Sequence, residues 1–135
     1  MIYLDHLTTT PPLPEVVDAM QPWLRAQFGA AASLHKLGLE ARDAIDESRM
    51  RLAKLVNAAE PEEIIFTSSG TEAINHAVKG VALANHRFGS HIVTTGIEHP
   101  AVLGSIAWLE SQGFSSTQVG VDGQGRVDPS ALGQA

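Results

Sequence analysis

The chain has 135 residues, of which 44% are hydrophobic, enough for one domain with a single core but short for an enzyme with a cofactor between two domains. Its 9 basic and 15 acidic residues give a net charge of -6, which argues against nonspecific binding to nucleic acid or to an anionic membrane. Without a cysteine, a long apolar run or a signal-peptide pattern, the sequence excludes a disulfide framework and favours a soluble, cytoplasmic protein.

The first half of the chain predicts two helices. Apolar side chains recur at helical spacing over residues 14–28, where Pro14 suits the first turn and Pro22 predicts a kink or an early end. A second helix is predicted over residues 33–57, with Ser33 as its cap. This helix has one broad apolar face and one charged face, which we expect to be exposed to solvent.

The second half alternates between strand and helix. Short apolar runs predict strands at residues 63–67, 91–95 and 116–121. Helices are predicted between these strands, and a turn and the start of a last helix follow the third strand. Two successive β-α-β units indicate an α/β fold with a mainly parallel sheet and flanking helices. Because three strands leave open sheet edges and the last helix has little room, we expect the sequence to be part of a longer one.

The segment between the first predicted strand and the next helix is the most informative local feature. Gly70 permits a close approach of the backbone, Thr71 adds a hydroxyl, and the free N–H groups of a first helical turn favour an anion. These properties suit a phosphate. The alternative is ordinary helix capping, because Ser, Gly and Thr are common capping residues and Glu72 is favourable in any first turn. The segment matches neither a Walker loop nor Gly-x-Gly-x-x-Gly.

His99 follows the second predicted strand as Gly70 and Thr71 follow the first. Because ligands of parallel sheets bind at the carboxyl ends of the strands, these residues could face one crevice. An imidazole at such a place can stack on an aromatic ligand or move a proton. The alternative is a histidine that only caps the helix opened by Pro100. The other histidines lack metal-ligand spacing, so no metal site is predicted.

Taken in order, these motifs resemble the cysteine desulfurases of the NifS/IscS type, in class V of the pyridoxal-phosphate-dependent aminotransferases. The resemblance covers essentially the whole chain and corresponds to about the first third of such an enzyme. The matching residues are 2–5, 9–11, 28–29, Ser33, His35, Gly38, 62–75, 79–80, 91–94, 98–103, 121–122 and 125–128.

The resemblance implies a type I aminotransferase-like fold for a pyridoxal-phosphate-dependent transferase. Residues 1–30 would form the N-terminal arm and a helix of the small domain at the entrance region, and residues 31–135 the first, incomplete part of the large cofactor-binding domain. Gly70 and Thr71 would hold the phosphate of pyridoxal 5'-phosphate. His99 would be both a cofactor-binding and a catalytic residue, stacking on the pyridine ring and assisting proton transfer.

The resemblance also implies an activity. Such an enzyme removes sulfur from L-cysteine, leaving alanine and an enzyme persulfide, for iron–sulfur cluster assembly or thio-cofactor synthesis. It works as a homodimer with a sulfur-acceptor or scaffold protein. The family's Schiff-base lysine and catalytic cysteine lie downstream of this segment, so we expect the 135 residues alone to be inactive without the remainder of the chain. Lys36 precedes the phosphate turn and is expected to be a solvated helix lysine.

Two alternatives remain open from the sequence. One is another class V member, such as a selenocysteine lyase or an aminotransferase, since the discriminating residues lie downstream. The other is a short, non-catalytic binding or assembly module that keeps only the early segment of the family.

Overall fold

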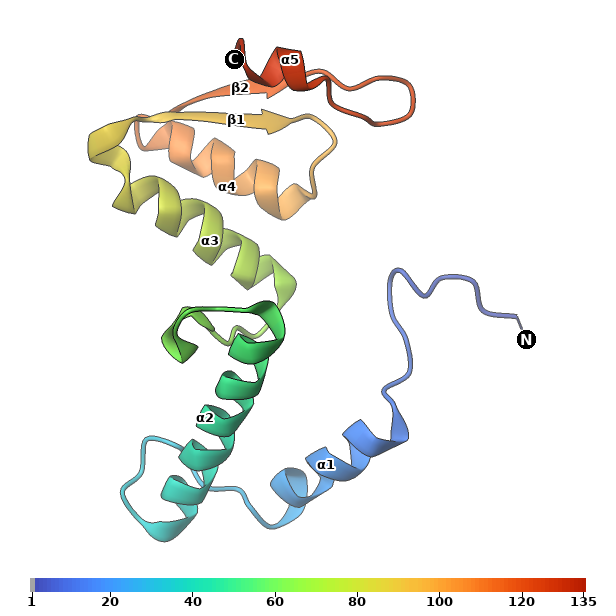
Figure 1. Cartoon of the computed structure of the whole chain (residues 1–135), viewed down its shortest axis with the longest axis vertical. Helices are drawn as coiled ribbons and strands as arrows, with labels where there is room; N and C mark the ends of the chain where they lie inside the picture. The colour runs from blue at the N-terminus through green and yellow to red at the C-terminus, as the bar shows by residue number, and fades with distance from the viewer. Residues whose placement is uncertain (1) are drawn as a thin grey trace. The chain divides into compact units, whose positions relative to one another are not determined.

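The computed structural model describes residues 2–135, which form two compact units, the first ending at Ile65 and the second spanning Phe66–Ala135 (Figure 1). This division follows the contacts within the chain, and the expected enzyme domains at residues 1–30 and 31–135 stay a prediction. No helix in the described part of the chain is both long and apolar enough to cross a membrane.

The first unit begins with helix α1, Pro14–Arg25. Pro14 occupies the first turn, as predicted, where its missing N–H costs no hydrogen bond. The helix ends three residues after Pro22, whose carbonyl accepts from the N–H groups of Ala26 and Gln27 at 2.9 Å each. The early end predicted from Pro22 is therefore confirmed. No residue of α1 is buried.

Helix α2, Lys36–Val56, starts later than predicted. Its cap is His35, whose Nδ1 accepts the N–H of Gly38 at 3.3 Å, so the assignment of the cap to Ser33 was wrong. The Ser33 N–H instead donates to the Ala30 carbonyl at 2.9 Å, which closes a turn before the helix begins. At the other end, Asn57 takes a left-handed conformation with φ 56°.

The connection between α1 and α2 is tightly built. A Cβ on Gly29 would lie 2.1 Å from the Leu37 carbonyl oxygen, and one on Gly38 would lie 2.3 Å from that of Ser33. Arg42 of α2 donates through Nε and Nη2 to the Ala31 carbonyl at 3.1 and 3.0 Å. Close backbone approach, which only glycine permits, therefore fixes this loop against α2.

The strand predicted at residues 63–67 is not formed. A short 3-10 helix occupies Pro61–Glu63, and residues 64–67 have no regular structure. Ile65 and Phe66 are 59% and 49% exposed. A strand requires a neighbouring strand to satisfy its backbone groups, and within residues 2–135 the sheet contains only β-strands His91–Thr95 and Ser115–Val119. The Ile64 carbonyl instead accepts a hydrogen bond from Arg49 Nε at 3.2 Å.

The second unit is a single β-α-β arrangement preceded by a helix. Its elements are α3 Gly70–Ala84, the 3-10 helix His86–Phe88, β1 His91–Thr95, α4 Pro100–Ser111, β2 Ser115–Val119 and α5 Pro129–Leu132. Strands β1 and β2 pair in parallel from His91↔Ser115 to Thr95↔Val119, and α3 packs against α4 (Figure 1). The parallel sheet with flanking helices confirms the α/β class. The prediction of two successive β-α-β units was wrong, because the first of its three strands is absent.

The core of the second unit lies between α4 and the sheet. Leu109 is completely buried, and Ile106, Phe114 and Val119 are 5–7% exposed. The buried apolar residues of α4 are Ile106 and Leu109. The side chains of α3 are at most half-buried, and Val81 is 64% exposed.

The chain after β2 follows the predicted turn and helix start. Asp122 Oδ1 accepts the N–H groups of Gln124 and Arg126 at 2.8 and 2.9 Å, and Gly125 has a φ of +77° that glycine tolerates. Asp128 then caps α5 by accepting the Ser130 N–H at 2.9 Å.

Candidate functional site

The sequence-predicted site residues all lie at helix N-termini of the second unit. Gly70 and Thr71 are the first two residues of α3, and His99 is the N-cap of α4. Figure 1 shows that α3 and α4 begin at the same end of the unit, the end toward which β1 and β2 run. This is the end at which open α/β sheets bind ligands, and all three residues are exposed there.

The start of α3 is held by a reciprocal set of hydrogen bonds. Ser69 Oγ accepts the Glu72 N–H at 3.2 Å, and the Ser69 carbonyl accepts the Ala73 N–H at 3.0 Å. In return, Glu72 Oε2 accepts the Ser68 N–H at 2.7 Å and the Ser68 hydroxyl at 2.5 Å. The arrangement is close to a capping box, shifted so that the glutamate reaches one residue before the cap.

This bonding leaves a defined group of donors for a ligand. Within residues 2–135, the N–H groups of Gly70 and Thr71 and the Thr71 hydroxyl make no hydrogen bond to another protein group. A Cβ on Gly70 would meet nothing within 4 Å, so the space beside it is open. Free N–H groups at the positive end of a helix, with a hydroxyl beside them, suit a phosphate dianion. These residues therefore fit the phosphate group of pyridoxal 5'-phosphate.

Glu72 is charged at neutral pH. Its pKa lies below the ordinary glutamate value because the carboxylate accepts hydrogen bonds from the Ser68 hydroxyl and the Ser68 N–H, with a smaller contribution from His76. The negative charge near the helix N-terminus is favourable to the helix itself.

His99 caps α4, and its imidazole ring is also exposed to solvent. Its Nδ1 accepts the Ala101 N–H at 3.1 Å, so the neutral ring carries its proton on Nε2. The hydrogen bond fixes the ring while leaving Nε2 exposed. The sequence left helix capping and ligand contact as alternative roles for His99. In the structure the two roles are compatible. Just before it, the Thr95 hydroxyl donates to Glu98 Oε1 at 2.9 Å, which ties the end of β1 to this loop.

Lys36 lies in the first unit at the start of α2. Its side chain is 88% exposed and its Nζ is 3.7 Å from Glu40 Oε1. The prediction of a solvated helix lysine is confirmed. Across residues 2–135 there is no group of three or more His, Asp or Glu side chains arranged to hold a metal ion.

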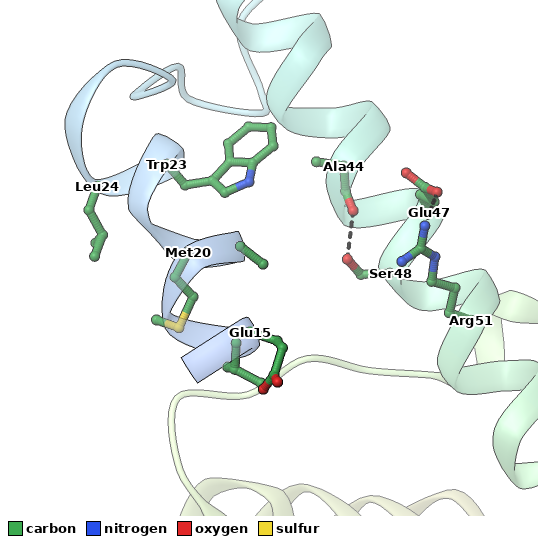
Figure 2. A pocket seen from close by; sticks show the side chains of 10 residues that line it. Glu15, Met20, Trp23, Leu24, Ala44, Glu47, Ser48 and Arg51 are labelled. Carbon is green, nitrogen blue, oxygen red and sulfur yellow. Dashed lines mark hydrogen bonds and ion pairs between the residues drawn. The ribbon is translucent and has the colours of Figure 1, made fainter. Parts of the chain in front are cut away.

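A groove in the first unit holds none of the predicted site residues. It has a volume of about 660 Å³ between α1 and α2, with Trp23 and Met20 on one wall and Ala44 on the other (Figure 2). Three of the polar side chains that line it are paired with other groups. Ser48 donates to the Ala44 carbonyl at 2.8 Å, and Arg51 pairs with Glu47 at 2.5 Å. Glu15 also lines the groove, whose walls are mainly apolar.

Sequence reasoning missed the connection between Glu72 and Ser68. Glu72 had only the general role of an acidic first-turn residue, whereas its carboxylate binds a residue outside the helix. The spacing of the serine and the glutamate, close to that of a capping box, is the signal that points to it.

Comparisons with known proteins agree with one another. The family model described as aminotransferase class-V matches residues 2–135. The chain is 48% identical over 134 residues to "Cysteine desulfurase IscS" of Dictyoglomus turgidum, covering 99% of this chain and 34% of the relative. The protein of the same name from Methanosarcina thermophila is 46% identical over 134 residues, with 99% and 33% covered.

Solved structures show the same likeness. A "NIFS-like protein" superimposes with a TM-score of 0.85 at 35% identity, covering 94% of this chain and 35% of that one. The structure described as "SspA in complex with cysteine" has a TM-score of 0.87 at 32% identity, with 98% and 38% covered. The chain spans about a third of the length of the curated relatives it matches.

Proposed function

The chain belongs to the aminotransferase class-V family, and from this we propose that it supplies the N-terminal third of a pyridoxal 5'-phosphate-dependent cysteine desulfurase. The observation that carries the proposal is the 48% identity over 134 residues to a protein named as a cysteine desulfurase. The full-length protein is this segment together with the remaining two-thirds of such an enzyme.

The proposed reaction removes sulfur from L-cysteine and leaves alanine, with the sulfur held as a persulfide on a cysteine outside this segment. A structural neighbour whose description names bound cysteine supports this substrate. When bound, pyridoxal 5'-phosphate supplies the electron sink for bond cleavage at the substrate. The 135 residues alone lack the cysteine that takes the sulfur, so the activity belongs to the full-length protein.

In this proposal, Gly70 and Thr71 bind the phosphate. Their N–H groups and the Thr71 hydroxyl have no other partner within residues 2–135, so phosphate binding breaks no hydrogen bond of the protein. The dipole of α3 adds a favourable interaction with the dianion. Binding at this point would fix one end of the cofactor at the N-terminus of α3.

His99 orients the ring of the cofactor and moves a proton. Its Nδ1 is occupied by the Ala101 N–H, so proton exchange takes place at Nε2. The same hydrogen bond limits rotation of the imidazole, which favours a stacked arrangement. The further proposals are a cytoplasmic homodimer and delivery of sulfur to an acceptor or scaffold protein, for iron–sulfur cluster assembly or thio-cofactor synthesis.

The test combines cofactor absorbance with product analysis in the full-length protein. We expect bound pyridoxal 5'-phosphate to absorb near the edge of the visible range, and we expect the protein to release alanine from L-cysteine. His99→Ala should lower kcat by roughly 10²- to 10⁴-fold, the usual contribution of a positioned acid–base group. His91→Ala, at the opposite end of β1, is the matched control and should leave kcat unchanged.

Three results would contradict the proposal. Absence of cofactor absorbance in a folded full-length protein would contradict the proposed dependence on pyridoxal 5'-phosphate. A silent His99→Ala variant would remove the assigned role of the histidine. Turnover of selenocysteine but not of cysteine, or amino-group transfer without sulfur release, would assign the protein to another activity within the family.

A further inference from the structure

We propose that Glu72 is a positioning residue for the phosphate of the cofactor, an inference that rests on the proposed function. Its carboxylate connects Ser68, in the chain that enters the helix, to the first turn of α3. Gly70 and Thr71, the proposed phosphate-binding residues, lie between these two ends. In the proposed arrangement Glu72 itself does not contact the phosphate.

Helix capping alone does not explain where the carboxylate points. Ser69 already caps α3, because its hydroxyl and carbonyl accept the N–H groups of Glu72 and Ala73. The Glu72 carboxylate adds nothing to those bonds. It binds the N–H and the hydroxyl of Ser68, which lies outside the helix, so its effect is to fasten the entering chain.

The hydrogen bonds between Ser68 and Glu72 determine which N–H and O–H donors of this turn remain free to bind an anion. With both Ser68 donors occupied by Glu72, the unbonded donors of this turn include the Gly70 and Thr71 N–H groups and the Thr71 hydroxyl. A second bond, from the Thr67 hydroxyl to the Ser69 carbonyl at 3.2 Å, holds the same turn. The turn is therefore ordered before any ligand arrives, which lowers the ordering cost of binding.

The charge of Glu72 supports a geometric role over an attractive one. An ionised carboxylate beside a phosphate dianion is repulsive, so its charge opposes binding of the anion. A residue that benefits the phosphate here must act through the hydrogen bonds it makes to Ser68. Substitutions that keep the hydrogen bonds without the charge, or the charge without the reach, separate these two effects.

The experiment measures the dissociation constants of pyridoxal 5'-phosphate and unphosphorylated pyridoxal in the apo form of the full-length protein, by absorbance. The ratio of the two constants reports on the phosphate alone. The variants are Glu72→Ala, Glu72→Gln and Glu72→Asp. The matched control is Glu110→Ala, because Glu110 also accepts a serine hydroxyl, that of Ser116 at 2.6 Å, near the C-terminus of α4.

We expect Glu72→Ala to reduce the preference for pyridoxal 5'-phosphate by about threefold to tenfold, the size of effect expected for one hydrogen bond. Glu72→Asp, one methylene shorter, should lose it similarly. Glu72→Gln should keep or increase the preference, since its carbonyl still accepts from Ser68 and the repulsion is gone. Glu110→Ala should match the wild type.

An unchanged ratio in Glu72→Ala and Glu72→Asp, with a normal preference in the wild type, would overturn the inference and leave the proposed function standing. Equal loss in Glu72→Gln would overturn it too, by assigning the effect to charge. If Glu72→Ala does not fold, Glu72→Asp and Glu72→Gln decide between these results. A wild type that binds neither compound, or both equally, would instead contradict the proposed phosphate site and the inference with it.

Discussion

The two units of the chain differ in how their apolar side chains are used. In the second unit, Leu109, Ile106, Phe114 and Val119 are buried between a helix and the parallel strands. In the first unit the buried hydrophobic residues are two alanines, Ala41 and Ala53, within the described part of the chain. A β-α-β arrangement closes a core over a short stretch of sequence, whereas two helices joined by a loop do not.

The difference matters for the candidate site. Gly70, Thr71 and His99 begin helices that pack against each other in the unit with the core. In the first unit, close backbone contacts occur in the loop around Gly29 and Gly38. The apolar side chains of α1 are exposed. The site is thus carried by the better packed unit, as preorganised binding requires.

The largest expected effect is on the core of the second unit. Leu109→Ala should lower the free energy of unfolding by about 2–5 kcal/mol, because it removes a fully buried side chain and leaves a cavity. Leu24→Ala in α1, where the side chain is 75% exposed, is the control and should change it by less than about 0.5 kcal/mol. Urea denaturation followed by circular dichroism measures both. Equal effects would show that the units do not differ in packing.

The next effect tests the loop of the first unit. Gly38→Ala should lower the free energy of unfolding by about 1–3 kcal/mol, because its Cβ would lie 2.3 Å from a backbone oxygen that has little freedom to move. Gly104→Ala, in the middle of α4 with nothing within 4 Å, should stabilise by about 0.5–1 kcal/mol through helix propensity. Thermal melts of the two variants provide the comparison. A neutral Gly38→Ala would mean that the loop is not tightly built.

The smallest effect is a pH dependence in the second unit. The pKa of Asp122 is lowered by the N–H groups of Arg126 and Gln124, and that of Asp128 by the hydroxyl and the N–H of Ser130. Groups with a lowered folded pKa stabilise above their ordinary pKa, and this contribution is lost as the pH falls through the folded value. We expect the melting temperature to fall below about pH 4, the ordinary range of carboxyl groups.

Asparagine variants test that assignment. Asp122→Asn and Asp128→Asn should flatten the acid limb of the melting curve, because the amide no longer titrates. An acid limb as steep as that of the wild type would show that other groups cause it.

Sequence reasoning succeeded where structure depends on local pattern. Strand β1 and helix α4 were found because their apolar spacing and the Pro100 start signal are local properties. The helix N-termini at Gly70 and His99 were found for the same reason, which is why candidate ligand groups could be named in advance.

The features that sequence reasoning missed depend on contacts with other parts of the chain. Residues 64–67 have the composition of a strand, but no neighbouring strand within residues 2–135 satisfies their backbone. The cap at His35 replaced Ser33 because Ser33 closes the preceding turn. The bonds from Ser68 to Glu72 depend on side-chain conformations that composition and periodicity do not specify.

A crystal structure of the full-length protein with pyridoxal 5'-phosphate would show directly whether the start of α3 binds the phosphate of the cofactor. We expect the phosphate to lie within hydrogen-bonding distance of the Gly70 and Thr71 N–H groups and the Thr71 hydroxyl, with the His99 ring against the pyridine. A phosphate bound by other groups, with the start of α3 facing solvent, would contradict it.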